Sequence, residues 1–141
     1  MTNWQKSFQK RPPSFVTLKK GLYLFHGTDA VEFDQIRGPA WFSSTIEGAK
    51  EWCSWKNEPW GGKNRVLRYQ VKSRIRLVDL TNIEEWQNAG MVLYKNPDPE
   101  TKQLARAFEK AGICGWVQRQ EVMIVRPSKA LVLDGVAWSA K

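Results

Sequence analysis

The chain has 141 residues, 42% of them hydrophobic, which predicts one globular domain with a sizeable core. With 22 lysines and arginines against 14 acidic residues, the formal net charge is +8. This charge favours an anionic partner such as nucleic acid, an acidic protein face or a phosphate-bearing small molecule, although a basic surface that only aids solubility also accounts for it.

No apolar run approaches the ~20 residues needed to span a bilayer. The polar start from Met1 to Lys10 predicts no signal peptide. We therefore expect a protein without membrane association, in the cytoplasm of the cell that makes it or of a host cell into which it is delivered. A monomer is expected.

The first part of the chain predicts an arm followed by strands. Residues 1–20 form the arm, which is loosely ordered or holds a short helix that a Pro-Pro pair ends. The apolar run 22–25 predicts the first strand, which leads straight into His26-Gly27-Thr28. The run Ala40–Phe42 predicts the next strand.

A helix is predicted directly after that second strand. Ser44 and Glu47 have the spacing of a capping box, in which the two residues satisfy the first free amides of a helix. The helix would run from about Thr45 to Lys56 and carry Ala49 and Trp52 on one side.

The rest of the chain predicts short strands and two more helices, which together indicate an α+β architecture. The predicted strands cover 66–71, 75–80, 121–125 and 130–133, and residues 91–94 predict a strand or a buried turn. The predicted helices cover 83–89 and 100–111. The apolar positions expected to be buried by the second of these helices are Leu104, Ala107, Phe108 and Ala111.

Neither the cysteines nor the histidine predict a metal site. Cys53 and Cys114 lie far apart and lack metal-ligand spacing, which predicts reduced thiols in or near the core of a cytosolic protein. His26 is the one histidine of the chain, so no second imidazole supports a metal site or a Ser-His-Asp triad.

Three features could carry chemistry, and each has a simpler structural explanation. His26 sits where an apolar strand meets a Gly-Thr turn, although a lone histidine is more commonly a satisfied, partly buried one. Glu121 opens an apolar strand, where a partly desolvated carboxylate stabilises positive charge or simply pairs with Arg119. Trp41 and Trp52 form either a slot for a planar ligand or part of the core.

Together these segments resemble the ADP-ribosyltransferase superfamily, and most closely its diphtheria-toxin and poly(ADP-ribose)-polymerase branch. That branch has a His-Gly-Ser/Thr turn after its first strand, matched by Phe25–Thr28, and a Tyr-Phe-Ala/Ser strand, matched by Ala40–Ser43. It has a second tyrosine further on, matched by Trp52, and a glutamate that begins a late apolar strand, matched by Gln120–Val125. The resemblance covers roughly residues 21–133.

The resemblance implies one ADP-ribosyltransferase-like domain over 1–141, with split antiparallel sheets, short flanking helices and a cleft for NAD+ between them. It implies two catalytic residues. Glu121 would bind the ribose 2′-hydroxyl and stabilise the oxocarbenium-like transition state, and His26 would hydrogen-bond the ribose attached to nicotinamide. NAD+ would be the substrate, with no metal.

Further residues would hold NAD+ by the same resemblance. The Gly27 backbone would bind the carboxamide, and Trp41 and Trp52 would sandwich the nicotinamide ring. Lys20 and Arg37 are candidates for the pyrophosphate, and nothing selects between them. The cofactor-binding residues so implied are His26, Gly27, Thr28, Trp41, Phe42, Ser43 and Trp52.

Three departures from the family's pattern bear on the reaction. Tryptophans replace both tyrosines, and Ala49 stands where polymerase members often have a serine that bonds the carboxamide. Arg119 stands where the arginine-modifying toxins place a glutamate or glutamine, which argues against arginine as the acceptor. No long insertion suggests a surface for chain elongation, so mono-ADP-ribosylation is expected.

The expected function is therefore that of a small effector or toxin of the bacterial or phage type, which transfers ADP-ribose from NAD+ to a protein or nucleic acid. One alternative is an NAD+ glycohydrolase on the same fold; a tRNA 2′-phosphotransferase shares the fold but relies on several arginines. Another is a basic, tryptophan-rich binding module without catalysis. Its natural anchors would be Trp4, Trp55, Trp60 and Trp138.

Overall fold

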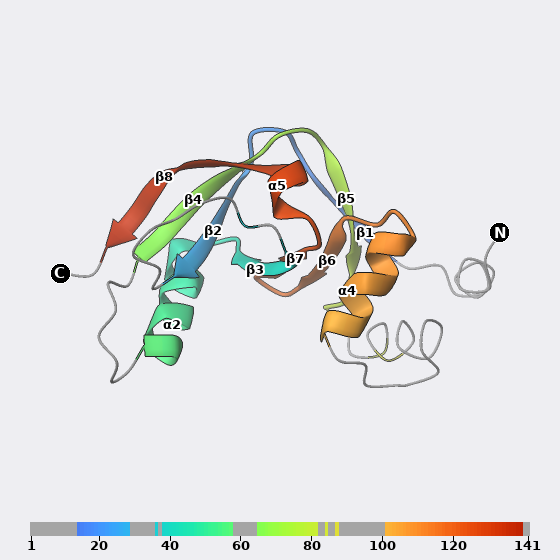
Figure 1. The fold of residues 1–141 in the computed structure, drawn as a ribbon, viewed down its shortest axis with the longest axis horizontal. Coiled ribbons are helices and arrows are strands. Elements are labelled where there is room, and N and C mark those ends of the chain that lie inside the picture. The colour runs from blue at the N-terminus through green and yellow to red at the C-terminus, as the bar shows by residue number, and fades with distance from the viewer. Residues whose placement is uncertain are drawn as a thin grey trace.

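Eight strands and three helices make up the described part of the chain in the computed structural model (Figure 1). The structure describes residues 14–28, 36, 38–57, 65–81, 84, 87 and 101–139, and of 52–57 the backbone alone. The strands are β1 (Phe15–Leu18), β2 (Tyr23–Thr28), β3 (Ala40–Ser43), β4 (Arg65–Val71), β5 (Ile75–Asp79), β6 (Gly115–Gln118), β7 (Glu121–Ile124) and β8 (Leu131–Ser139). The helices are α2 (Ile46–Asn57), α4 (Thr101–Lys110) and α5 (Pro127–Ala130).

All eight strands belong to one sheet, in the order β1-β5-β6-β7-β3-β2-β4-β8. Only β5 and β6 run parallel within it, and the other neighbours are antiparallel. The predicted α+β class is confirmed. The sheet differs from the expected pair of antiparallel sheets, because its pairing is continuous and it is mixed.

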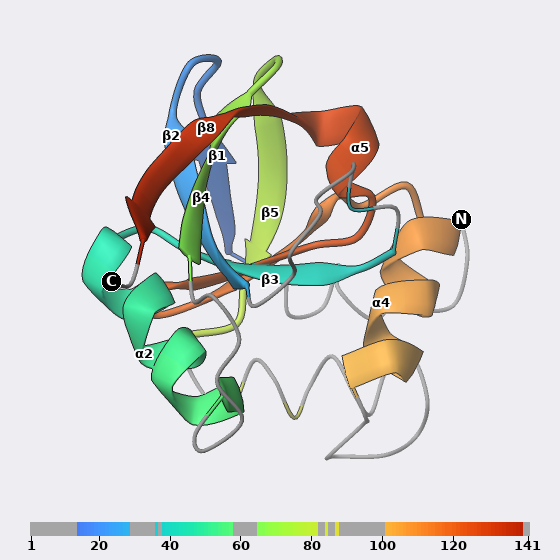
Figure 2. The same ribbon diagram turned by 60° about the vertical axis from the view of Figure 1, so that its left-hand side comes forward.

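The sheet is narrowest between β2 and β3, where a single residue pair, Phe25 and Ser43, links the strands. On its other side β2 pairs along its whole length with β4. In Figure 2, β3 runs across the view below the more upright β2 and β4. The backbone pairing of the continuous sheet therefore narrows to one residue pair between two halves.

The core occupies both faces of β3 and β7, because side chains alternate along a strand. One face contributes Phe42 and Val122 to the largest apolar cluster, which also contains residues of β2, β4 and β5. The other face contributes Trp41 and Met123 to a second cluster, which α4 covers. A third, smaller cluster lies under α2.

Helix α4 covers its cluster with a slightly different face from the one predicted. Leu104 and Phe108 are fully buried as expected, and Ala105 is buried beside them. Ala107 and Ala111 are only partly buried. The prediction of those two alanines as core was wrong because the helix is rotated so that the row through 104, 105 and 108 faces the sheet.

Part of the predicted N-terminal arm is a strand. Phe15–Leu18 pairs with β5, which places Leu18 opposite Ile75 and turns Val16 and Leu18 toward the core. A run of four residues beside a Pro-Pro pair is too short to show strand periodicity, and long-range pairing decides its structure. Residues 1–13 lie outside the described part.

The last strand is longer than predicted. β8 extends from Leu131 to Ser139 because it pairs along all of β4, with two register shifts, and a short helix, α5, precedes it. Trp138, expected as an exposed anchor, is half-buried beside α2, with Lys50 Nζ 4.9 Å from its ring centroid. Trp4, Trp55 and Trp60 lie outside the residues whose side chains are described.

Other predictions cannot be compared with the structure. The helix over 83–89 and the segment 91–94 fall almost wholly outside the described residues, as do the loop 29–35 and Arg37. Cys114 is a half-buried free thiol against the core, as expected, and the side chain of Cys53 is not described. No helix in the described ranges has the length and apolarity to cross a membrane.

The buried phenol of Tyr69 makes the fold sensitive to alkaline pH. Tyr69 is 4% exposed, and burial raises the pKa of its hydroxyl well above the ordinary value. The unfolded chain therefore releases this proton at about pH 10 while the folded protein retains it, so the free energy of unfolding falls as the pH rises above about 10.

Tyr69→Phe is expected to make that fall shallower in urea titrations between about pH 8 and pH 11. Burial also raises the pKa of the Cys114 thiol, so Cys114→Ala is the matched comparison for the remaining slope. An unchanged pH dependence in Tyr69→Phe would contradict this assignment.

Candidate functional site

The three segments that carry the sequence signature lie on adjacent strands. β3 is flanked by β2 on one side and β7 on the other. Phe25–Thr28, Ala40–Ser43 and Gln120–Val125 are therefore neighbours, although they are far apart in the chain. Ser43 connects them, because it is directly opposite Phe25 in β2 and directly opposite Glu121 in β7.

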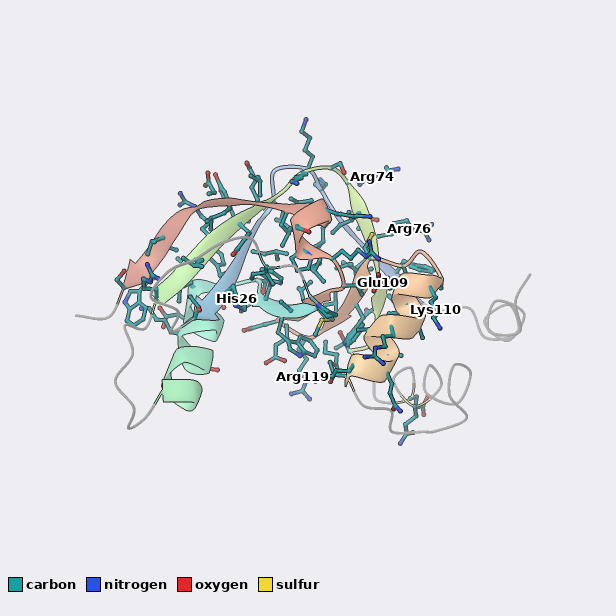
Figure 3. The ribbon with its side chains drawn as sticks, viewed as in Figure 1. His26, Arg74, Arg76, Glu109, Lys110 and Arg119 are labelled. Atoms are coloured by element: carbon teal, nitrogen blue, oxygen red, sulfur yellow. The ribbon has the colours of Figure 1, made fainter. Side chains whose placement is uncertain are left out.

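A cavity lies where β2 and β3 diverge. Continued pairing would bring Gly27 opposite Trp41, but the ladder ends after Phe25 and Ser43. The imidazole of His26 bridges the gap instead, with Nδ1 2.8 Å from the carbonyl oxygen of Trp41; His26 is labelled in Figure 3. The cavity has a volume of about 330 Å³, and the residues that line it include Phe25, His26, Gly27, Pro39, Ala40, Trp41, Phe42, Ser43 and Ala49.

The bond to Trp41 fixes the orientation and tautomer of His26. A carbonyl oxygen only accepts hydrogen bonds, so Nδ1 carries a proton, and in the neutral ring Nε2 is then the acceptor nitrogen. The ring also lies against Phe42, with 5.3 Å between the centroids. His26 therefore presents a defined polar edge in the cavity wall.

Glu121 lines a second, adjoining cavity of about 580 Å³. Its strand position sets it directly opposite both Ser43 in β3 and Gln118 in β6, and side chains of directly opposed residues lie on one face of a sheet. Ser43 lines both cavities. The residues of the second cavity are Ser43, Gly48, Glu51, Leu80, Thr81, Gln118, Arg119, Gln120 and Glu121.

The hairpin before Glu121 is held from two sides. The backbone N–H of Arg119 donates to Thr81 Oγ1 at 3.1 Å, and the N–H of Ser44 donates to the carbonyl of Gln120 at 3.0 Å. Arg119 has a φ of +59°, a value at which a two-residue hairpin turn usually has glycine. The side chain of Arg119 lines the second cavity.

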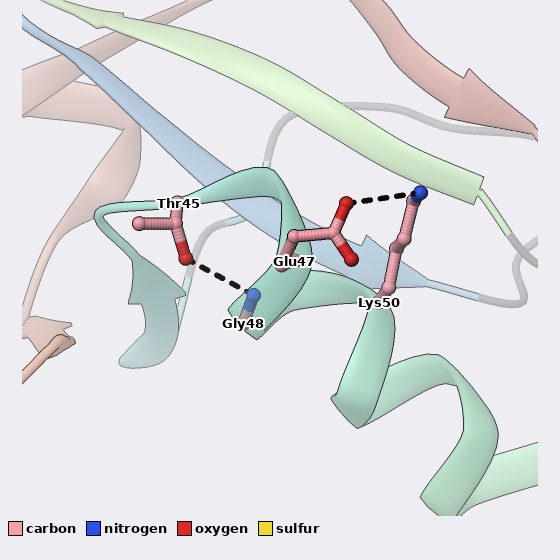
Figure 4. A network of polar contacts seen from close by, with 4 residues as sticks. All are labelled: Thr45, Glu47, Gly48 and Lys50. Atoms are coloured by element: carbon pink, nitrogen blue, oxygen red, sulfur yellow. Dashed lines mark hydrogen bonds and ion pairs between the residues drawn. The ribbon is translucent and has the colours of Figure 1, made fainter.

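Helix α2 begins one residue later than its sequence predicts. Thr45 is the capping residue, since its Oγ1 accepts from the N–H of Gly48 at 3.0 Å (Figure 4). The predicted capping box of Ser44 and Glu47 is therefore wrong. Glu47 is one position too early to reach back to the cap, and it pairs with Lys50 at 3.2 Å instead.

Gly48 allows α2 to approach β3 closely at the boundary between the two cavities. A Cβ at this position would be 2.3 Å from Ser43 Oγ and 3.1 Å from Thr45 Oγ1. Real Cβ atoms do not approach that closely, so any larger residue must displace the Ser43 hydroxyl. The hydroxyl is itself engaged, because it accepts from the N–H of Thr45 at 3.2 Å.

Gly48→Ala is expected to lower the free energy of unfolding by about 1 kcal/mol, because overpacking exceeds the gain in helix propensity. The clash depends on Ser43 Oγ, so the same change in a Ser43→Ala background should be less destabilising than in wild type. A double-mutant cycle in urea measures the difference. Additive effects of the two substitutions would show that the predicted contact is absent.

The structure separates the predicted site residues into three groups. His26, Gly27, Trp41, Phe42 and Ser43 line the first cavity, together with Ala49. Glu121 lines the second cavity, so the two predicted catalytic residues do not share one. Thr28 is buried in β2 opposite Arg65 and borders neither.

The aromatic rings of this site are partly committed to the core. Trp41 is half-buried and contacts Trp116 edge to face, with 5.7 Å between centroids. Phe42 is 1% exposed and packs on Tyr69 at 5.3 Å. The side chain of Trp52 is not described, so the predicted nicotinamide sandwich cannot be compared with the structure.

Sequence reasoning missed three polar residues that line the second cavity with Glu121, namely Glu51, Thr81 and Gln118. Gln118 is oriented by Trp116, whose Nε1 donates to its Oε1 at 3.3 Å. Of these three residues, only Gln118 lies close to Glu121 in the sequence. Thr81 reaches the site through the pairing of β5 with β6, which no local pattern reveals.

No cluster of three or more potential metal ligands occurs among the described histidine, cysteine, aspartate and glutamate residues. The fold and the two cavities define this chain as an α+β protein with a polar candidate site at the junction of two sheet halves. Comparison with protein-family models, with curated proteins and with solved structures found no match.

Proposed function

We propose that this chain is a mono-ADP-ribosyltransferase, which transfers ADP-ribose from NAD+ to a protein or nucleic acid. The observation that carries the proposal is the adjacency of β2, β3 and β7. Segments of the signature that are far apart in the chain lie on three neighbouring strands, which is the arrangement expected of residues that serve one site. Ser43, opposite both Phe25 and Glu121, is the point of convergence.

The two cavities are suitable in size and lining for a dinucleotide. Their volumes of about 330 and 580 Å³ fall within or near the range of ligand pockets, roughly 300–1,000 Å³. The first offers aromatic and small apolar surface with one oriented imidazole, which suits a nicotinamide ring and its ribose. The second offers carboxylate, amide and hydroxyl groups together with Arg119.

In the proposed reaction the bond between ribose C1′ and the nicotinamide nitrogen breaks, nicotinamide leaves with the bonding pair, and an acceptor lone pair bonds to C1′ as the acceptor loses a proton. Glu121 stabilises the positive charge that grows at C1′ and binds the 2′-hydroxyl. His26 orients the ribose through its imidazole, which the Trp41 carbonyl holds in place. The ends of β2 and β3 supply the walls around the nicotinamide.

Adenine-labelled NAD+ tests the proposal. The protein is incubated with the label and a cell lysate, and nicotinamide release is measured along with label on protein, on nucleic acid and in free ADP-ribose. Glu121→Gln is the matched control, since it keeps the shape of the side chain and removes its charge. Label on a macromolecule that depends on Glu121 is the expected result.

The other outcomes separate the alternatives. Free ADP-ribose without a labelled macromolecule would identify an NAD+ glycohydrolase. Absence of NAD+ turnover in both proteins would overturn the enzymatic proposal and leave a binding module.

A further inference from the structure

A band of exposed basic residues lies around the two turns that join β1 to β2 and β4 to β5. All six of its members are exposed, and none forms an ion pair with a residue in the described ranges. We call this surface the basic crest. Its members are Lys19, Lys20, Lys72, Arg74, Arg76 and Lys129.

Three segments from distant parts of the chain form the crest. Leu18 is opposite Ile75 in the β1–β5 ladder, which brings Lys19 beside Arg74. The N–H of Gly21 donates to the carbonyl of Val71 at 2.9 Å, so the two turns are in direct contact. Lys72 joins them to α5, since its Nζ donates to the Ser128 carbonyl at 2.8 Å.

The charge of the crest is not balanced within these segments. Residues 14–22, 71–78 and 126–131 contain no aspartate or glutamate. Arg126, at the border, is neutralised by an ion pair with Glu109 and is therefore not counted in the crest. The crest therefore gathers on one surface part of the positive charge that gives the whole chain its formal +8. A surface with several neighbouring cations attracts a polyanion rather than a single small anion.

Two exposed aromatic rings flank the crest. Phe15 is 44% exposed, with the Arg76 guanidinium 4.2 Å from its ring centroid. Tyr23 is 43% exposed, with Arg68 at 5.0 Å. Flat rings beside guanidinium groups are the surfaces on which unpaired bases stack while cations follow the phosphates.

We propose that the basic crest binds single-stranded nucleic acid. The flanking rings distinguish this partner from a duplex, in which bases are stacked on each other and not available to Phe15 or Tyr23. A membrane surface fits less well, because the crest lacks the continuous apolar face with which an interfacial element enters lipid. The two flanking rings and Leu22 are the exposed large apolar side chains on β1, β2 and the turn between them, and Val132, Leu133 and Val136 are exposed on β8.

This inference goes beyond the proposed transferase activity. The crest lies on the turns, β5 and α5, whereas the candidate site lies at the junction of β2, β3 and β7. Figure 3 shows Arg74 and Arg76 on the opposite side of the view from His26. Binding at the crest therefore requires neither His26 nor Glu121.

Fluorescence anisotropy with fluorescein-labelled oligo(dT) and oligo(U) of about 15 nucleotides tests the proposal. If all six cations of the crest contact phosphates, log Kd should depend on log salt with a slope of magnitude about 4. The variant Arg74→Glu/Lys129→Glu should bind at least about tenfold more weakly, with a shallower salt dependence. Glu121→Gln should bind like wild type, which separates a failure here from a failure of the proposed activity.

The matched control is Lys102→Glu/Arg106→Glu on α4, which changes the same number of exposed charges outside the crest. It is expected to bind within about twofold of wild type, because screening limits charge effects to roughly 10 Å. Equal losses in both variants would overturn the crest as a specific surface. Equal affinity for a duplex, or binding only to vesicles of phosphatidylserine and phosphatidylcholine, would overturn the assignment of a single strand.

Discussion

Glu121→Gln is expected to reduce nicotinamide release from NAD+ by about 100- to 1,000-fold, which corresponds to about 2.7–4 kcal/mol of lost transition-state stabilisation. A glutamine keeps the size of the side chain and a hydrogen-bonding oxygen, but it removes the charge that would oppose the growing positive charge on the ribose. Glu121 is at the first position of β7, where pairing on both sides fixes its backbone. The fold should therefore survive the substitution.

Glu51→Gln provides the matched comparison, because Glu51 lines the same cavity from α2 and its loss changes the net charge equally. We expect it to retain activity within about an order of magnitude, since no residue of the signature corresponds to it. Rates of nicotinamide release at saturating NAD+ and thermal unfolding curves measure both effects. Equal losses of activity in the two variants would show that Glu121 is not the catalytic carboxylate.

Gly115→Ala is expected to lower the free energy of unfolding by about 3 kcal/mol or more and Tm by roughly 10 °C. Gly115 starts β6 with a φ of +152°, and a Cβ there would be 1.8 Å from the carbonyl oxygen of Met123. That oxygen belongs to the backbone of β7, which cannot move without disturbing the ladder that positions Glu121. Such a loss is a large share of a typical total of about 5–15 kcal/mol.

Gly112→Ala separates the clash from the backbone strain. Gly112 also has a positive φ, +76°, but a Cβ there would have no atom within 4 Å. Its substitution should cost only about 1 kcal/mol of conformational strain. Chemical denaturation of the two variants side by side measures the difference, and equal destabilisation would show that the contact with Met123 is not the cause.

Local sequence patterns predicted several helices and strands closely. The helix predicted from about Thr45 to Lys56 is observed over Ile46–Asn57, and the strand predicted over 121–125 is observed over Glu121–Ile124. The cap was predicted one residue early because Ser44 and Thr45 are both good capping residues, and the sequence does not say which one turns its side chain to the helix. In the fold it is Thr45, whose Oγ1 accepts from the N–H of Gly48.

Two strands that depend on distant partners were predicted poorly. β1 exists because β5 is beside it, and β8 extends to Ser139 because β4 offers it a full-length partner. The site follows the same rule. His26 and Glu121 could be selected from the sequence, but Thr81 and Glu51 could not, because only strand pairing and helix packing bring them to the cavity.

The junction between β2 and β3 also connects the two halves of the sheet. One residue pair and the imidazole of His26 hold the two sheet halves together there. A ligand that accepted the hydrogen bond of His26 Nδ1 in place of the Trp41 carbonyl would break one of these two connections. Ligand binding in the cavity and separation of the two halves would then be coupled, so a ligand that favours separation would also bind the separated form more tightly.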